Sequence, residues 1–348
     1  MTKGHPLNII KKQIENYFND VWGKKHGAKM SIFDDLSPVM NTYKAFDELL
    51  IPLDHPGRQP TDTYYLSQEQ QILLRPHTSA HQNEILREGI TSFLCTGDVY
   101  RRDSIDATHF PIFHQMEGVH VFPKEALPGV EEKDTLLVVE DMKMALEGLA
   151  KHLFGDVKFR WNSEYFPFTD PSYELEIFFR EQWLEVLGCG AIHQQILKNT
   201  NLSPRRGWAF GLGLERLAMI LFSIPDIRLF WSGDQRFLSQ FSSPSPSTPL
   251  PKFKPYSKHE ICTKDISFWL PPSFHDHAFF DVVRDVAGDL VENVTLIDSF
   301  KDVSSGRESK CFRVSYRSMD RNLTNKEIVP IQEQVRARCE SELGLKLR

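Results

Sequence analysis

The sequence has 348 residues, of which 41% are hydrophobic, and its 41 Lys and Arg against 47 Asp and Glu give a formal net charge of −6. That length predicts about two domains, and that composition excludes an intrinsically disordered chain, a collagen-like repeat and a small disulfide scaffold. No apolar run approaches the roughly 18 residues of a membrane-spanning helix, so we expect no membrane span. The five cysteines are scattered without a CxxC pair, which favours a reducing compartment and no structural zinc.

A mixture of helices and strands is predicted for the first part of the chain. In chain order, the pattern predicts a helix at 6–18, strands at 93–100, 112–122, 174–179, 183–188 and 208–213, and a helix at 214–222. The polar segment 102–109 turns between the first two strands. Because hairpins rather than crossover helices join these strands, we predict an antiparallel sheet and an α+β fold.

A linker separates this block from the tail. Residues 242–251 contain four serines and four prolines, a composition that buries little surface and favours an extended chain. Beyond it, the pattern predicts a strand at 265–270, a helix at 278–290, strands at 294–300 and 310–317, a helix at 324–343 that opens with a capping box, and a last short strand at 345–348. The order βαββαβ is typical of a ferredoxin-like domain. We therefore predict domains at 1–241 and 256–348, joined by a linker at 242–255.

Polar and aromatic side chains gather on the first predicted hairpin. Phe113, Gln115 and Glu117 share one strand face because side chains alternate along a strand, and Arg101 and Asp103 share a face of the partner strand. An aromatic ring, an amide, carboxylates and a guanidinium would then converge on one surface. A solvated sheet face with cross-strand ion pairs fits the same spacing and remains the alternative.

A glycine-rich turn precedes the helix at 214–222. The run from Gly211 to Arg216 lacks the third glycine of a dinucleotide-binding fingerprint, and no βαβ unit surrounds it, which excludes that kind of site. Two glycines allow a ligand to approach the backbone closely. Arg216, in the first turn of the helix, suits a triphosphate or the face of a purine. A surface arginine after a bend is the alternative.

These two segments resemble motifs 2 and 3 of the class II aminoacyl-tRNA synthetases. Longer runs at 46–58, 75–82, 165–169 and 208–216 narrow the resemblance to the single-chain organellar phenylalanyl-tRNA synthetase family. The resemblance covers nearly the whole chain in a fixed order. It implies a class II antiparallel sheet flanked by helices, followed by a C-terminal ferredoxin-like anticodon-binding domain.

The resemblance implies an ATP site in which Mg²⁺ bridges the phosphates. Arg101 would hold the α-phosphate and His109 would contact the phosphates, while Phe113 and Arg216 would stack on the two faces of adenine. Arg101, Arg216 and His109 are the residues expected to assist the chemistry directly. The full expected ATP set is Arg101, Asp103, Thr108, His109, Phe110, Phe113, Glu185 and Arg216. Glu185 is a candidate for either ATP or Mg²⁺, and the metal ligands are left unassigned.

The resemblance also implies a pocket for phenylalanine. Phe166 and Phe168 would form an aromatic wall. Gln115 and Glu117, with His77 and Ser79, would bind the amino group. From the residues alone, two phenylalanines astride Pro167 more often signify core packing, and Ser79 also fits a helix cap. The full expected set is His77, Ser79, Ala80, His81, Gln82, Gln115, Met116, Glu117, Phe166, Phe168, Ala209, Phe210 and Gly211.

Basic charge is concentrated in the second half of the tail. Residues 307–348 hold 10 Lys and Arg against 6 Asp and Glu, whereas residues 256–306 hold 4 against 9. Arg313 and Arg317 lie on a strand face opposite to Phe312 and Tyr316, and we expect both arginines to contact tRNA phosphates. A solvated strand face is the alternative.

The implied reaction activates L-phenylalanine with ATP and transfers it from phenylalanyl-adenylate to the terminal ribose 2′-OH of tRNA(Phe). The resemblance further implies a monomer in the mitochondrial matrix, with a plastid as the alternative. Because a predicted helix begins almost at the first residue, we expect no transit peptide in this sequence, so that either the protein acts where it is made or a presequence has been removed. A non-catalytic RNA-binding descendant would be expected to lose Arg101, Arg216, Gln115 or Glu117. Another ATP-dependent ligase on the same fold would need neither the aromatic pocket nor the tail.

Overall fold

The computed structural model describes residues 4–67, 69, 71–127, 131–241, 250–254, 259–302, 304 and 306–348. Most of the predicted linker, residues 242–249 and 255, lies outside them. The chain forms two compact units. The first comprises residues 1–101, 112–224 and 241–252, and the second comprises residues 102–111, 225–240 and 253–348. Residues 102–111 and 225–240 therefore group with the tail, although both segments lie inside the predicted first domain.

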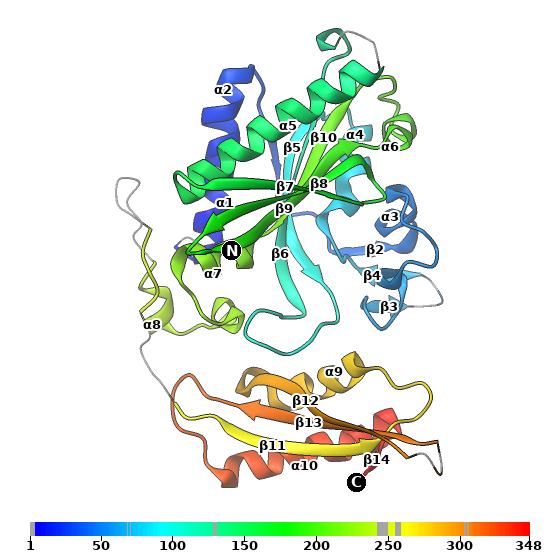
Figure 1. Cartoon of the computed structure of the whole chain (residues 1–348), viewed down its shortest axis with the longest axis vertical. Coiled ribbons are helices and arrows are strands. Elements are labelled where there is room, and N and C mark those ends of the chain that lie inside the picture. Colours follow the sequence, from blue (N-terminus) through cyan, green and yellow to red (C-terminus); the bar gives the residue numbers. More distant parts are fainter. Residues whose placement is uncertain are drawn as a thin grey trace. The chain divides into compact units, whose positions relative to one another are not determined.

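A seven-stranded sheet with the order β1-β5-β6-β10-β9-β8-β7 runs through the first unit (Figure 1). Its strands are β1 (Ser31–Phe33), β5 (Ser92–Tyr100), β6 (Ile112–Val121), β7 (Lys158–Glu164), β8 (Thr169–Phe179), β9 (Gln182–Ile192) and β10 (Gly207–Gly213). Every neighbouring pair is antiparallel except β1 and β5, which run parallel. The predicted antiparallel hairpins are confirmed, and the short parallel strand at the edge makes the sheet mixed.

Helices α1 (Pro6–Asn16), α5 (Glu131–Phe154) and α7 (Leu214–Phe222), with the π-helical turn η1 (Tyr17–Trp22), cover one face of this sheet. Aromatic rings fill the interface: Phe18 stacks on Phe210 with ring centroids 5.2 Å apart, and the Trp208 indole donates to Asp141 on α5 over 2.8 Å. The helix predicted at 6–18 is thus confirmed as α1, continued by the π-helical turn. We call this side the helix face.

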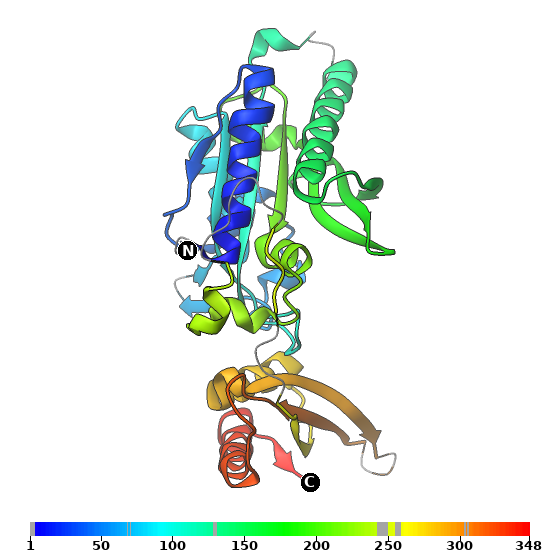
Figure 2. The same ribbon diagram turned by 90° about the vertical axis from the view of Figure 1, so that its left-hand side faces the viewer.

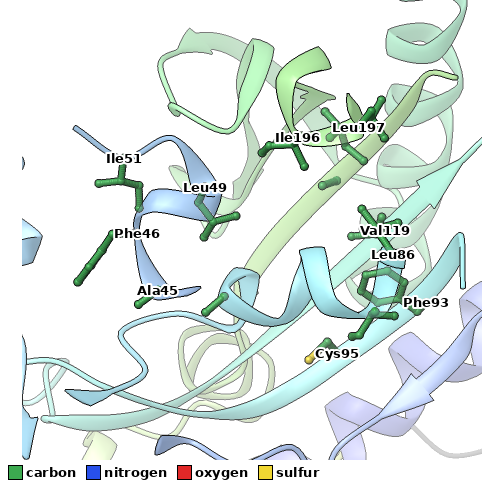
Figure 3. Packing of buried hydrophobic residues seen from close by; sticks show 14 of the residues in the cluster. Ala45, Phe46, Leu49, Ile51, Leu86, Phe93, Cys95, Val119, Ile196 and Leu197 are labelled. Atoms are coloured by element: carbon green, nitrogen blue, oxygen red, sulfur yellow. The ribbon is translucent and has the colours of Figure 1, made fainter. Parts of the chain in front are cut away.

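The opposite face of the sheet carries short elements. They are β2 (Val39–Asn41), α3 (Thr42–Ala45), η2 (Asp47–Leu49), β3 (Tyr65–Ser67), β4 (Ile72–Leu74), η4 (Thr78–His81), α4 (Gln82–Arg87) and α6 (Gln194–Asn199). Figure 3 shows Leu49, Leu86 and Leu197 from three of these elements in one cluster with Phe93 and Val119 of the sheet. Ala80 and Ala209 belong to the same cluster, which fixes η4 against the sheet. We call this side the ligand face.

The tail folds as predicted into a four-stranded antiparallel sheet with two helices. Its elements are β11 (Cys262–Trp269), α9 (Asp276–Ala287), β12 (Val291–Lys301), β13 (Glu308–Tyr316), α10 (Asn325–Leu343) and β14 (Lys346–Leu347), and the strand order is β12-β13-β11-β14. Both helices lie on the same side of the sheet (Figure 2). Phe268, Phe279 and Phe312 form the centre of this core. The capping box of Thr324 and Glu327 opens α10 as predicted.

The remaining helical elements are short. They are α2 (Gly23–His26), η3 (Pro56–Arg58), η5 (Lys124–Ala126), η6 (Ile227–Trp231), α8 (Gln235–Leu238) and η7 (Gly288–Leu290). Among the described residues, none of the helices combines the length and the apolar character needed to cross a bilayer.

Candidate active site

Strands β5 and β10 end at the same end of the sheet, and the two predicted arginines follow them there. Tyr100, the last residue of β5, pairs with Ile112 at the start of β6, and Arg101 follows it. Gly213, the last residue of β10, pairs with Gln115 of β6, and Arg216 lies in the first turn of the helix that follows. The start of β6 therefore lies between the segments that carry both guanidinium groups.

Arg101 is held by the segment that precedes η4. Its Nε donates to the carbonyl of Pro76 over 2.7 Å, and its guanidinium carbon lies 5.2 Å from the centre of the Phe113 ring. Because β5 ends at Tyr100, Arg101 and Asp103 lie beyond the strand rather than on it. The guanidinium is thereby placed next to the ring that was predicted to stack on adenine.

Glycines leave the ligand face open at the end of β10. A β-carbon added at Gly211 or Gly213 would meet no other atom within 4 Å. Beside this opening, Arg216 donates through Nη1 to Glu185 over 2.9 Å, and 63% of its side chain is exposed. An exposed ion pair of this kind contributes little to stability, so a ligand can replace the carboxylate at small cost.

Carboxylates line the neighbouring strands. Glu176 of β8 pairs directly with Glu185 of β9, and Glu174 lies two residues away. Burial, followed by the charges of Glu185, Glu164 and Glu176, raises the pKa of Glu174. Oxygen ligands of this type are the ones that Mg²⁺ prefers, and Mg²⁺ usually takes only one or two of them together with phosphates. Glu174 and Glu185 therefore fit such an ion.

A buried polar cluster of His77, Ser79, Gln82 and Glu117 lies deeper on the ligand face. Glu117 and Gln82 are only 2% and 1% exposed. Among the described residues, both amide atoms of Gln82, one carboxylate oxygen of Glu117 and both ring nitrogens of His77 have no hydrogen-bond partner of normal geometry. Buried polar groups without partners are costly and rare. This cluster is therefore an orphaned set of donors and acceptors that a polar ligand can complete.

Burial controls the charge of this cluster. It raises the pKa of Glu117 to about 8, although the Ser79 hydroxyl acts in the opposite direction. Burial and the nearby charge of Arg101 lower the pKa of His77 to about 3. Without a ligand, the cluster at neutral pH thus holds a neutral imidazole and a carboxyl group that is mainly protonated. A cationic ligand would convert this carboxyl group into its ion pair.

An aromatic wall stands beside the glycine opening. The rings of Phe166 and Phe168 are stacked with centroids 5.9 Å apart and planes inclined by 15°. Gly188 of β9, which pairs with Gly211, lies under the first ring, because a β-carbon there would be 2.9 Å from Phe166 Cζ. The wall, the opening and the polar cluster together provide an apolar slot next to a polar end.

Two predicted pocket residues point away from this slot. Phe210 packs its ring on Phe18 of the helix face, and a β-carbon at Gly118 would be only 2.1 Å from Phe210 Cε1. Met116 is fully buried and has the same strand parity as Gly118, whereas Gln115 and Glu117 have the opposite parity. The assignment of both side chains to the phenylalanine pocket is therefore wrong, since alternation along β10 and β6 directs them to the helix face.

Other predicted pocket residues support the slot from behind. Ala80 and Ala209 belong to the ligand-face core cluster. The His81 ring lies 2.5 Å from Glu84 and 2.8 Å from Arg75, so it is fully engaged within the fold. Gln115 lies between Gly97 and Gly213 in the ladder, on the same face as Glu117.

The loop between β5 and β6 belongs to the second unit. Asp106 organises it: the carboxylate accepts from the backbone of Thr108 over 2.7 Å and lies 2.6 Å from the ring of His109. Burial raises the pKa of the Asp106 carboxyl group, but these hydrogen bonds outweigh burial and hold the pKa below its usual range. The Phe110 ring stacks on Trp231 at 5.6 Å, and the Asp103 carboxylate accepts from the next backbone N–H. His109 is thus oriented by a residue that the sequence did not single out.

Two further positioning residues escaped the sequence analysis. Arg75 is 2% exposed and donates to the carbonyls of Asp98 and Leu36, which ties β5 to the edge of the sheet. Glu215 is buried and accepts from the backbone and the ring of His114, which ties α7 to β6. Both residues lie inside the segments that carry the family resemblance, but no chemical role marked them.

The two arginines predicted to contact tRNA both have carboxylate partners. Arg313 forms a two-pronged pair with Asp265 at 2.8 Å for each bond. Arg317 lies 3.2 Å from Glu292. Both lie in the second unit, and their contact with RNA stays a prediction.

Comparison with known proteins places both parts of the chain. Residues 1–241 match the family model of the class II tRNA synthetase core domain (F), and residues 257–348 match that of the ferredoxin-fold anticodon binding domain. The chain is 53% identical to the phenylalanine–tRNA ligase, chloroplastic/mitochondrial, of Arabidopsis thaliana, covering 99% of this chain and 78% of the relative. It is 47% identical to the mitochondrial phenylalanine–tRNA ligase of Dictyostelium discoideum, covering 99% and 85%. It is 37% identical to that of Saccharomyces cerevisiae, covering 100% and 88%.

Proposed function

The chain belongs to the phenylalanine–tRNA ligases of the class II aminoacyl-tRNA synthetases, and from that premise we propose how its residues carry out the two steps. In the first step the carboxylate of phenylalanine attacks the α-phosphorus of ATP, and pyrophosphate leaves. In the second step a terminal ribose hydroxyl of tRNA attacks the acyl carbon of the adenylate, loses its proton, and AMP leaves. Positioning and charge neutralisation supply the rate, without a nucleophilic side chain.

The amino acid is oriented by the buried polar cluster. Its ammonium group donates to Glu117, and Gln82 and Ser79 complete the remaining bonds, while the ring enters the slot between Phe166 and the glycine opening. The observation that carries this proposal is the set of buried polar atoms without partners on the ligand face. Because an ammonium ion stabilises the charged carboxylate, phenylalanine binding at neutral pH releases a proton from Glu117.

ATP lies along the edge where β5, β6 and β10 end. Arg101 neutralises the α-phosphate, whose charge grows in the transition state, and the adenine stacks between Phe113 and Arg216. Arg101 is held beside Phe113 by its bond to the carbonyl of Pro76, whereas Arg216 leaves an exposed ion pair with Glu185 when the nucleotide binds. We keep Asp103, Thr108, His109 and Phe110 as contacts of the nucleotide.

Mg²⁺ would be held by Glu174 and Glu185 together with the phosphates. Such an ion supplies neutralisation of the phosphate charge. When the ion pair between Glu185 and Arg216 opens, Arg216 can stack on the adenine and Glu185 can bind the metal ion. Binding of the nucleotide and binding of the metal are thereby linked.

The second unit binds tRNA(Phe), with Arg313 and Arg317 on phosphates. We further propose that the protein acts as a monomer in the mitochondrial matrix. The matching ferredoxin-fold anticodon binding domain supports tRNA binding, and the organellar names of the relatives support the mitochondrial location.

Phenylalanine-dependent exchange of labelled pyrophosphate into ATP tests the first step. We expect exchange with phenylalanine and far less with tyrosine, and esterification of tRNA(Phe) when the RNA is added. A protein that binds tRNA without any exchange would be the non-catalytic descendant. Exchange that depends on another carboxylic acid would indicate a different ligase on this fold.

A further inference from the structure

Among the residues that the structure describes, both helices of the ferredoxin-like domain lie on one side of its sheet, and the other face carries none. Residues directly opposite in an antiparallel ladder share a face, and Trp269 of β11, Phe300 of β12 and Ser309 of β13 lie opposite one another. Phe268 and Phe312 have the other parity and point into the helix-covered core. Trp269 and Phe300 therefore lie together on the open face.

Two guanidinium groups lie over these rings. The guanidinium carbon of Arg307 is 4.3 Å from the centre of the Trp269 ring. That of Arg348 is 5.3 Å from Trp269 and 5.2 Å from Phe300, and its Nη1 donates to Ser309 over 3.1 Å. We call Trp269, Phe300, Arg307 and Arg348 the aromatic–arginine cluster.

The two rings of the cluster do not belong to the hydrophobic core of the domain. Phe300 is 44% exposed, and its centroid is 6.3 Å from that of Trp269 with the planes inclined by 66°, so the two rings leave part of their faces open. Planar rings interleaved with guanidinium groups on an open four-stranded sheet have the chemistry that holds unpaired nucleobases by stacking and adjacent phosphates by charge. Arg307 and Arg348 supply the positive charge at the rings that complements a polyanion.

We propose that the aromatic–arginine cluster binds an unpaired nucleotide of the tRNA, with its base stacked on Trp269 or Phe300 and its phosphates against Arg307 and Arg348. This inference rests on the proposed function and refines it. It adds base stacking to the phosphate contacts proposed for Arg313 and Arg317, and Arg313 lies on the same face of the sheet, where two hydrogen bonds to Asp265 hold it.

Substitution of single rings tests the proposal in the full-length protein. Trp269→Leu and Phe300→Leu should each raise the KM for a tRNA(Phe) transcript about 5- to 150-fold, the range expected for one lost stack, with an unchanged salt dependence. Arg307→Gln should weaken binding and reduce the salt slope by about one. Phenylalanine-dependent pyrophosphate exchange should stay unchanged in all three variants, because none of these residues belongs to the first unit.

Val329→Ala is the matched control, because Val329 is an exposed apolar residue of α10, on the helix-covered side of the same domain. It should leave the KM for tRNA unchanged. Competition by an isolated anticodon stem-loop, and none by a blunt RNA duplex of equal length, would assign the ligand as an unpaired base. Equal competition by the duplex would overturn the stacking role in favour of phosphate attraction alone.

The proposal is also overturned if Trp269→Leu and Phe300→Leu, with thermal unfolding like that of the parent, leave the KM for tRNA within twofold. A protein interface would be the remaining use of the rings in that case. The proposed function fails separately, through the absence of pyrophosphate exchange and aminoacylation in the unsubstituted protein.

Discussion

The two faces of the seven-stranded sheet are built from the same strands, yet side chains fill the helix face and leave the ligand face partly open. On the helix face, Phe210 and Trp208 fill the space up to α1 and α5, and the indole of Trp208 has its acceptor in Asp141. On the ligand face, glycines leave the backbone open and Glu117 keeps an unpartnered oxygen. Stability and function therefore alternate residue by residue along β6 and β10.

This alternation means that neighbouring residues have different consequences when changed. Gly118 and Glu117 are adjacent in β6, and Phe210 and Gly211 are adjacent in β10, but each pair is divided between the faces. A substitution on the helix face should lower the free energy of unfolding. A substitution on the ligand face should lower substrate affinity and leave stability equal or higher.

The largest effect is expected for Glu117→Gln. Loss of a buried charge partner for the ammonium group costs about 2–5 kcal/mol, which corresponds to a roughly 30- to several-thousandfold fall in kcat/KM for phenylalanine. Pyrophosphate exchange at varied phenylalanine concentration measures it. A fall of less than threefold would remove Glu117 from the site.

The same variant should be more stable than the parent at alkaline pH. The folded pKa of Glu117, about 8, lies above the ordinary value of 4.5, so the folded state holds its proton more tightly and loses stability as the pH rises through this window. Glutamine has no such loss. The advantage of Glu117→Gln should be absent near pH 4.5 and reach the order of a few kcal/mol above pH 8. Thermal unfolding of both proteins across this range checks the sign, and a variant that is less stable at pH 8.5 would contradict the buried carboxyl group.

A matched pair of glycine substitutions separates the two faces. Gly118→Ala places a β-carbon 2.1 Å from the Phe210 ring and should destabilise the protein by about 1–3 kcal/mol or more, visible as a lower Tm. Gly211→Ala meets no atom and should keep the Tm of the parent. It should instead raise the KM for phenylalanine roughly tenfold by filling the slot. Similar Tm losses in both variants would show that the two faces are packed alike.

The smallest effect is expected for Gly188→Ala. Its β-carbon would lie 2.9 Å from Phe166 Cζ, so the ring must shift by a few tenths of an ångström toward the slot. We expect a severalfold higher KM for phenylalanine, with kcat for exchange and the Tm close to those of the parent. Combination with Phe166→Leu should relieve the contact. If Gly188→Ala lowers kcat and leaves KM unchanged, the aromatic wall is not part of the binding slot.

Local patterns were enough to predict much of this architecture. Period-two alternation located β5 and β6, and their ladder puts Phe113, Gln115 and Glu117 on one face as predicted. The order of strands and helices in the tail identified the ferredoxin-like fold before any contact was known. These features depend on spacing within a single element or between adjacent ones, which a sequence records directly.

Features that depend on distant segments could not be predicted in this way. The parallel strand β1 has three residues and no periodic signal, so its pairing with β5 follows only from tertiary contacts. Phe210 and Met116 were assigned to the pocket as members of a motif, although alternation directs their side chains to the helix face. The grouping of residues 102–111 with the tail, and the role of Asp106 in orienting His109, likewise depend on the folded chain.

The carboxylate of Glu215 ties the first turn of α7 to the backbone of β6. Arg216 on that turn and Glu117 on that strand are consequently parts of one rigid frame. The distance between the nucleotide site and the amino-acid site is therefore fixed before the substrates bind. The frame therefore fixes how far the carboxylate of an amino acid, bound through its ammonium group at Glu117, lies from the α-phosphate of ATP. An amino acid with a longer backbone, such as a β-homologue of phenylalanine, should still bind at the amino-acid site. Its carboxylate would be misplaced for attack on the α-phosphate, so it should fail to react.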